Sequence, residues 1–288
     1  MGSLVQKPTL GEKIFDASNY IFLIIFSLLC IIPFIYVFIS SFSTSNSVWP
    51  SGFTLDAYKY IFTTQTFIRS LGVSAYITIL GTFMSVVVTA LIAYSLSYKE
   101  IPGRKWIMLA IIFTMLFNGG MIPTYIVVKN LHMIDTYWAL MLPNLVSAFY
   151  LIVMRSFFSN IPNELIESAK IDGAHDIIVL IKIVLPLSLP VIAAISLFYA
   201  VGIWNQYFGA VMYLNSPEKW PVQVILRQIV ILSTGNIGDE SAMDADSSVF
   251  GQGLKMAVVI VSIIPILIVY PFIQKHFAKG MLLGSVKG

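Results

Sequence analysis

The sequence predicts an all-α, polytopic membrane protein with six transmembrane helices. Two observations lead to this expectation. Of the 288 residues, 58% are hydrophobic and only 11% are charged, whereas a soluble domain usually carries about 25% charged residues. Apolar runs close to the length of about 20 residues that a helix needs to cross a bilayer recur along the chain. Helices are expected rather than strands, because an open sheet would leave backbone groups unpaired in lipid.

Each predicted span is an apolar run flanked by polar residues. The second is longer than a bilayer requires, so it is expected to tilt or to project from the membrane. The first follows two lysines, as a signal peptide would, but its apolar core is too long and no small-residue cleavage site follows it, so it is expected to be retained. The six runs lie at residues 20–42, 68–98, 106–128, 137–158, 183–204 and 254–272.

Basic residues are distributed unevenly between the two sides that these spans define. The N-terminus, the loops 99–105 and 155–182 and the C-terminal tail hold eleven of the 17 lysines and arginines, against six on the opposite side. Lysine and arginine accumulate on the cytoplasmic side, so both termini are predicted to be cytoplasmic. The expected organisation is a cytoplasmic segment 1–19, a membrane domain 20–272 with a polar cytoplasmic segment at 162–176 and an outward loop at 205–253, and a cytoplasmic tail 273–288.

The outward loop 205–253 has two parts that differ in composition. Residues 219–232 show the pattern of an amphipathic helix, which is expected to lie on the membrane surface. Residues 238–250 are acidic and rich in serine and aspartate, a composition typical of a mobile loop.

The sequence contains no constellation of residues that indicates catalysis or metal binding. Its three histidines lie far apart, and Cys30 is the one cysteine, so neither a zinc site nor an internal disulfide is expected. The glycine-rich tail 280–288 departs from the G-x-x-x-x-G-K-[ST] spacing of a phosphate-binding loop. We therefore expect no catalytic residue, no metal and no cofactor in this chain. The net charge of +3 gives no reason to expect a nucleic-acid partner.

The predicted spans carry no acidic or basic residue near their centres. Ion-coupled transporters usually place ionisable groups at that depth, so a secondary transporter is the less favoured alternative. If the chain moves a solute uphill, the energy must then come from a partner protein.

The segment 162–176 is a conspicuously polar stretch between two apolar spans and holds four of the 14 acidic residues. Asn160 or Asn163 is expected to cap a short helix, with Pro162 in its first turn. Glu164 lies where the helix dipole favours a negative charge. Gly173 is expected to end the helix with a positive φ, and a second helical stretch is expected to begin near residue 176.

The residues alone leave two roles open for this short helix. It could lie on lipid headgroups as an ordinary amphipathic loop, or it could dock on another protein. Leu165, Ile166 and Ala169 give it one apolar side. The acidic residues at its start make binding to headgroups the less natural of the two, but they do not decide between them.

The segment contains the run Glu167-Ser-Ala-x-x-Asp172-Gly173-Ala174, which is followed by Leu185-Pro186. This run closely resembles the EAA signature of ABC importer permeases, in which E-A-A-x-x-D-G-A is followed at a fixed distance by L-P. Ser168 stands in place of the usual second alanine, and Leu180 stands where phenylalanine is common. The resemblance implies that the segment is a coupling helix that docks on a cytoplasmic ATPase subunit. The residues implied in this contact are Glu164, Glu167, Ser168, Ala169, Asp172, Gly173, Ala174, Leu185 and Pro186.

Further motifs extend the resemblance over nearly the whole chain. Gly119-Gly120, the run from Asp135 to Pro143 and the stretch that begins at Arg155 are similar to MalG-like carbohydrate importer permeases, and in particular to their branch for complex oligosaccharides. The resemblance implies a type I importer permease in a prokaryotic plasma membrane. The implied partners are a second homologous permease, a cytoplasmic ATPase dimer that binds ATP and Mg²⁺, an extracytoplasmic solute-binding protein, an oligosaccharide and membrane lipid. An importer for another solute stays open as an alternative.

Aromatic and amide side chains near the outer halves of the spans are candidates for sugar contacts. Sugars are held by aromatic faces together with hydrogen bonds from amides and hydroxyls. Aromatic residues also anchor membrane proteins at the interface, and the partner permease could hold most of the contacts. The candidates are Tyr137, Trp138, Asn144, Tyr150, Trp204, Asn205 and Tyr207.

Overall fold

The computed structural model describes residues 9–45, 49–232 and 251–284, with the backbone alone for residues 232 and 272–284. Within these ranges every regular element is a helix, which confirms the predicted all-α class. The chain divides into two compact units, residues 1–61 with 232–261 and residues 62–231 with 262–288. The predicted mobile loop 238–250 lies outside the described residues.

The first unit contains α1 (Leu10–Ser40), most of α2 (Asp56–Thr63) and the beginning of α14 (Gly251–Gly284). A capping box opens α1, because Thr9 N–H donates to Glu12 and Glu12 N–H donates back to Thr9 Oγ1. The helix therefore starts ten residues before the predicted span. At its other end the Phe42 ring stacks on Tyr58, with 4.9 Å between centroids, and holds the turn that follows α1.

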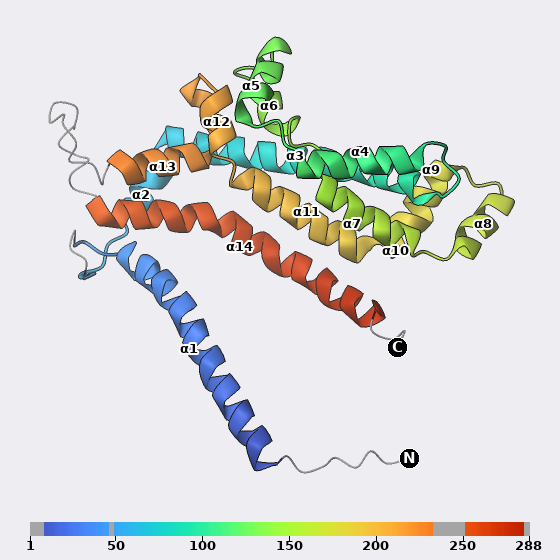
Figure 1. Cartoon of the computed structure of the whole chain (residues 1–288). Coiled ribbons are helices and arrows are strands. Elements are labelled where there is room, and N and C mark those ends of the chain that lie inside the picture. Colours follow the sequence, from blue (N-terminus) through green and yellow to red (C-terminus); the bar gives the residue numbers. More distant parts are fainter. Residues whose placement is uncertain (1–8, 46–48, 233–250, 285–288) are drawn as a thin grey trace. The chain divides into compact units, whose positions relative to one another are not determined.

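The second unit is built along the long helix α3 (Gln65–Ser97), against which α7 (Ala148–Ser159) and α11 (Leu189–Trp204) pack (Figure 1). A stripe of small residues on α3 recurs every fourth position and is buried. Small residues let membrane helices approach closely. At Gly81 an added Cβ would lie 3.0 Å from Ile203 Cδ1 of α11. The stripe consists of Gly81, Ser85, Thr89 and Ala93.

Tyr199 joins three parts of this bundle through its hydroxyl. The oxygen lies 2.9 Å from Thr89 Oγ1 of α3, and it accepts a 2.9 Å hydrogen bond from Ser147 N–H at the start of α7. Buried hydroxyls need partners in an apolar interior. Tyr199 of α11 therefore fixes α3 and α7 by the same polar contact.

Two separate apolar clusters form at the two ends of α3. The cluster that we name the Met154 cluster includes Ala90 and Tyr94 of α3, and the Leu140 cluster includes Val73 and Ile77. These two parts of α3 are about 25 Å apart at 1.5 Å per residue. Figure 1 shows the elements of the two clusters at opposite ends of this helix, with α8 and α9 at one end and α5, α6 and α12 at the other.

The third predicted span, 106–128, is not a continuous helix. It consists of α4 (Arg104–Leu116) and α5 (Met121–Asn130), with a bend of 115° between them. The break contains Gly120 with φ +88°, and the Asn118 side chain accepts a 2.8 Å hydrogen bond from Gly120 N–H. An asparagine that binds the backbone in this way competes with helical hydrogen bonding, so the chain breaks within the predicted span.

The fourth predicted span, 137–158, is also interrupted. It holds α6 (Trp138–Met141) and α7, with no helix between residues 142 and 147. Pro143 lies in the gap and lacks the N–H that would continue α6. Among the described residues, three helices are long and apolar enough to cross a membrane, or five if each bent pair is one span. The count of six spans and the domain limits derived from it stay predictions.

The fifth predicted span, 183–204, is assembled from short pieces. α9 (Asp176–Val179) continues through a π-helical turn (Leu180–Val184) and α10 (Leu185–Leu187), and an 85° bend separates these from α11. Pro190 has no N–H to offer the carbonyl of Pro186, one turn earlier, so the helix cannot continue regularly across Ser188.

The predicted amphipathic helix at 219–232 is present as α13 (Val222–Leu232), after a 3₁₀ turn at Pro217–Lys219. Its first residue donates a 2.8 Å hydrogen bond from Val222 N–H to Ser74 Oγ of α3, and Val224 is buried in the Leu140 cluster. The beginning of α13 packs on protein, and its position on the membrane surface stays a prediction. α12 (Phe208–Tyr213) precedes it.

Candidate functional site

The predicted coupling segment forms a helix, a glycine turn and a second helix. α8 (Asn163–Ile171) ends in a Schellman motif, in which Ala174 N–H donates to Ala169 O at 2.9 Å and Gly173 N–H donates to Lys170 O at 3.0 Å. Gly173 has φ +82°. The expected positive φ at this glycine and the new helical start at Asp176 are both found.

Two details of α8 differ from expectation. Pro162 is the N-cap residue, and no side chain caps the helix, so the roles expected for Asn160 and Asn163 were wrong. The predicted apolar side also divides. Ile166 packs against the Met154 cluster, whereas Leu165 is exposed.

Most of the predicted ATPase-contact residues are exposed, on α8, on the turn that follows it and on α10. Nothing lies within 4 Å of a Cβ built at Gly173, so open space surrounds the turn. Ile171, at the end of α8, is 85% exposed. The exposed members of the predicted set are Glu164, Glu167, Ser168, Asp172, Gly173 and Pro186, whereas Ala169, Ala174 and Leu185 pack against the Met154 cluster.

The turn is fastened to the end of α3 by charged and aromatic groups that the sequence did not single out. Lys170 Nζ lies 2.9 Å from Asp176 Oδ1 and 4.9 Å from the centroid of the Tyr98 ring. The Tyr98 hydroxyl donates to the same Asp176 oxygen at 3.5 Å. The hydrogen bond to Asp176 raises the pKa of Lys170 above its usual value. Lys170 and Asp176 are six residues apart, so helical spacing alone gives no signal for this pair.

Two arginines converge on one carbonyl at the same end of α3. The Nε groups of Arg104 and Arg155 each donate to Leu96 O at 2.9 Å. The last carbonyls of a helix have no intrahelical partner and carry partial negative charge. The two guanidinium groups supply hydrogen bonds to this carbonyl and connect the start of α4 and the middle of α7 to α3. Sequence reasoning placed Arg155 in a motif without predicting this role.

At the opposite end of α3, Asp135 organises the chain between α5 and α6. Its carboxylate accepts hydrogen bonds from Asn215 N–H at 3.0 Å, Ser216 N–H at 3.0 Å and Ser216 Oγ at 2.7 Å, and it pairs with Lys219 Nζ at 2.7 Å. These donors stabilise the charged form and hold the pKa of Asp135 well below its usual value, with Lys219 the largest cause. The residue has φ +60°, a left-handed conformation that aspartate tolerates.

Two of the predicted sugar-contact residues lie beside this ion pair. Tyr137 and Trp138 line a cavity of about 280 Å³ together with Tyr76, Asp135 and Lys219. The rings of Tyr76 and Tyr137 lie 5.7 Å apart between centroids. The cavity combines aromatic faces with polar groups, but the two charged groups in it are already paired with each other.

The other predicted sugar-contact residues do not converge on that cavity. Tyr207 packs against the Leu140 cluster, with the Arg227 guanidinium 4.4 Å from its ring centroid, and Asn205 bonds to Val201 O at 2.9 Å. Trp204 is buried and donates to Ser262 O at 3.2 Å. Asn144 is exposed in the loop between α6 and α7, and Tyr150 packs in the Met154 cluster against Tyr199, far from the cavity.

The described residues contain no group of three or more histidine, cysteine, aspartate or glutamate side chains that could hold a metal ion. The second unit is a helical bundle with an exposed, glycine-ended helix at one end of α3 and a cavity-bearing loop region at the other.

Comparison with known proteins agrees with this architecture. The model of the family described as "Binding-protein-dependent transport system inner membrane component" matches residues 1–283. The chain is 54% identical over 284 residues to the "Polygalacturonan/rhamnogalacturonan transport system permease protein YtcP" of Bacillus subtilis (strain 168), covering 96% of this chain and 99% of the relative. It is 50% identical to "Protein LplC" of the same organism, covering 97% of both chains.

A solved structure has the same fold. A chain of a bacterial ABC transporter involved in the import of the acidic polysaccharide alginate superimposes with a TM-score of 0.86 and 32% sequence identity, covering 95% of this chain and 100% of that chain. The predicted family, the type I permease fold and the multi-pass location in the inner membrane are confirmed. The chain belongs to the family of binding-protein-dependent transport system inner membrane components, and it is a permease subunit of an ABC importer whose ATPase is a separate chain.

Proposed function

We propose that this permease translocates oligosaccharides derived from acidic polysaccharides and takes its driving force through the segment 162–176. The support for the substrate is the relative named for polygalacturonan and rhamnogalacturonan transport, to which over half of the aligned residues are identical. The structural relative involved in alginate import acts on another acidic polysaccharide. An importer for a different solute is the alternative, and the transport assay below distinguishes the two.

The exposed end of α8 supports the coupling role. Glu167, Asp172 and Gly173 project from the bundle, while Ile166 and Ala169 pack behind them against the Met154 cluster. A helix with one side packed on the bundle and the other side exposed can transmit the movement of a docked partner to α3, α7 and α11. We infer that this partner is the cytoplasmic ATPase dimer, which binds ATP and Mg²⁺, and that both termini of the chain are cytoplasmic.

The mechanism that follows is alternating access. A second permease would complete the pathway, and an extracytoplasmic binding protein would deliver the sugar. ATP binding and sugar delivery would each favour one of two states through a difference in affinity, and hydrolysis would reset the inward-facing state. The centres of the predicted spans carry no charged side chain, which favours energy supply from a partner over ion coupling.

Transport by the purified complex in proteoliposomes tests this proposal. The complex contains this permease, its partner permease, the ATPase and the binding protein. We expect ATP-dependent uptake of galacturonate or rhamnogalacturonan oligosaccharides, abolished by omitting either ATP or the binding protein. Uptake restricted to neutral sugars or to a solute that is not a sugar would contradict the proposed substrate. Uptake driven by an ion gradient without ATP would contradict the coupling.

A further inference from the structure

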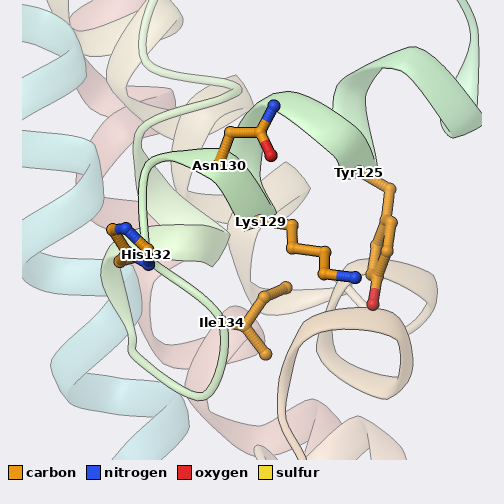
Figure 2. A pocket seen from close by; sticks show the side chains of 5 residues that line it. All are labelled: Tyr125, Lys129, Asn130, His132 and Ile134. Carbon is orange, nitrogen blue, oxygen red and sulfur yellow. The ribbon is translucent and has the colours of Figure 1, made fainter.

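A second cavity, of about 620 Å³, lies where α5 ends and the chain turns toward α6. Its volume falls in the range of about 300–1,000 Å³ that is common for small-molecule sites. Figure 2 shows the side chains that line it, and the Lys129 side chain extends toward that of Tyr125. The lining residues are Tyr125, Lys129, Asn130, His132 and Ile134.

Three of these side chains carry polar groups that bind nothing within the part of the chain that the structure describes. Lys129, Asn130 and His132 are exposed, and none of their side chains makes a hydrogen bond or ion pair there. Lys129 is in the last turn of α5, where the helix dipole favours a cation. The dipole gives no reason for an amide and an imidazole beside it. Three unpaired donors around one cavity are suited to a ligand with several oxygen atoms.

The backbone holds this cavity in shape. His132 has φ +55°, and Met133 N–H donates to Val128 O at 3.2 Å, which turns the chain back over the end of α5. Two residues later, the hydrogen bonds of Asp135 fix the loop to the segment that follows α12. The backbone that carries the lining side chains is therefore already ordered before a ligand arrives, and such preorganisation favours binding.

The charge of the cavity is not neutralised from its own surroundings. Asp135 lies close in sequence but is already bound by Lys219 at 2.7 Å, so it is not the partner of Lys129. The two lysines therefore differ in kind, because one completes a structural ion pair and the other presents a free ammonium beside an aromatic ring. A carboxylate is the group that an ammonium binds through a charge-assisted hydrogen bond.

We propose that this cavity binds one acidic sugar unit of the transported oligosaccharide, with the carboxylate of the sugar on Lys129. Asn130 and His132 donate to hydroxyl oxygens, and Tyr125 and Ile134 contact the ring. The cavity is bordered by exposed side chains, so the remaining sugar units continue into solvent. The inference rests on the proposed function, because only an acidic substrate has a carboxylate to offer.

Two probes that differ only in charge test this inference. They are trigalacturonate and its neutral counterpart, in which each carboxyl is reduced to an alcohol. In proteoliposomes with the complete complex, Lys129→Met is expected to raise the KM for trigalacturonate about tenfold, the size of one charge-assisted hydrogen bond. The KM for the neutral probe stays unchanged. Lys105→Met, which removes an exposed lysine at the start of α4, is the control and alters neither value.

Direct binding separates failure of the site from failure of the proposed function. Saturation-transfer NMR on the purified complex without the binding protein detects trigalacturonate whether or not it is transported, and we expect the signal to fall in Lys129→Met but not in Lys105→Met. Loss of binding in the variant supports the site even if uptake of acidic sugars is absent. Uptake and binding of trigalacturonate that are equal in Lys129→Met and the unsubstituted complex overturn it. An equal rise in KM for both probes also overturns it, because that result assigns the cavity to contact with the binding protein.

Discussion

The two ends of α3 each carry a lysine–carboxylate pair, and the pairs are built differently. Asp176 is 63% exposed and bonds to Lys170 at 2.9 Å and to one tyrosine hydroxyl at 3.5 Å. Asp135 is 27% exposed and is held by Lys219 and three further donors, all within 3.0 Å. Displacing the carboxylate would therefore break two bonds at Asp176 and four at Asp135.

This difference matches the roles proposed for the two ends. The contact between α8 and α3 has to transmit a displacement from the ATPase and readjust between two states, which an exposed pair worth about 0.2–1 kcal/mol allows. A loop that presents cavities to a sugar must keep its geometry, and a carboxylate with four donors resists displacement. The following experiments test whether the ends differ in this way.

The largest effect is expected at Gly173. A branched side chain in its left-handed conformation costs about 1–2 kcal/mol, so Gly173→Val should open the turn and lower both transport and ATPase association more than tenfold. Because nothing lies near a Cβ at this position, the loss comes from conformation and not from a clash. Uptake by proteoliposomes and copurification of the ATPase measure it.

Two variants show whether the effect belongs to coupling. Gly173→Asn should keep most activity, since asparagine tolerates the left-handed region. Gly103→Val places the same strain in another turn with φ +75° and open space, and it should leave ATPase association intact. Full transport by Gly173→Val would contradict the coupling role of the turn at Gly173. An equal loss of ATPase association in Gly103→Val would contradict it as well.

A smaller effect is expected at the other end, where Asp135→Asn keeps the shape of the side chain and removes its charge. Its pKa is lowered in the folded protein, so the carboxylate stabilises the fold at pH values above the unfolded pKa of about 3.9. That contribution is lost as pH falls below this value toward the folded pKa. The melting temperature of Asp135→Asn should be a few degrees lower at pH 6, and the difference should shrink toward pH 3.

Asp56 supplies the control for this measurement. Its carboxylate also has a lowered pKa, chiefly through Thr54, but its lysine lies 3.5 Å away and both side chains of the pair are mostly exposed. Asp56→Asn should change the melting temperature less at every pH. If Asp135→Asn melts at the same temperature as the unsubstituted protein at pH 6, the loop does not depend on this carboxylate.

The sequence predicted features of this fold that depend on local chemistry. Gly173 needs a positive φ and Asp176 begins a helix, and both follow from neighbours in the chain. The all-α class follows from composition. The breaks at Gly120 and Pro143 were missed because hydropathy averages over a window and does not register one residue that interrupts helical hydrogen bonding.

Contacts between distant parts of the chain could not be read from the sequence. Asp135 and Lys219 are 84 residues apart, and Leu96 and Arg155 are 59 apart. Nothing in the periodicity of either segment specifies such a partner. For the same reason the seven candidate sugar-contact residues were chosen by type, and the structure brings only Tyr137 and Trp138 into one cavity.

The smallest change in stability is expected for Lys170→Met, and it bears most directly on the comparison between the two ends. The exposed pair contributes little to the fold, so the melting temperature should stay within about one degree. The variant nevertheless frees Asp176 and removes the cation from the Tyr98 ring, so α8 is held less firmly to α3. We expect about twice as much ATP to be hydrolysed per sugar imported, since a displacement of α8 by the ATPase then moves α3 less.

Lys182→Met is the matched control, because Lys182 is an exposed lysine of the π-helical turn that follows α9. The double variant Lys170→Met/Asp176→Asn sharpens the test, since two residues that act through one contact lose their effect once and not twice. A ratio of hydrolysis to uptake that stays constant in Lys170→Met would show that α8 transmits its motion through the Met154 cluster alone. A melting temperature that falls as far as in Asp135→Asn would show that the two pairs do not differ in the way their bonding indicates.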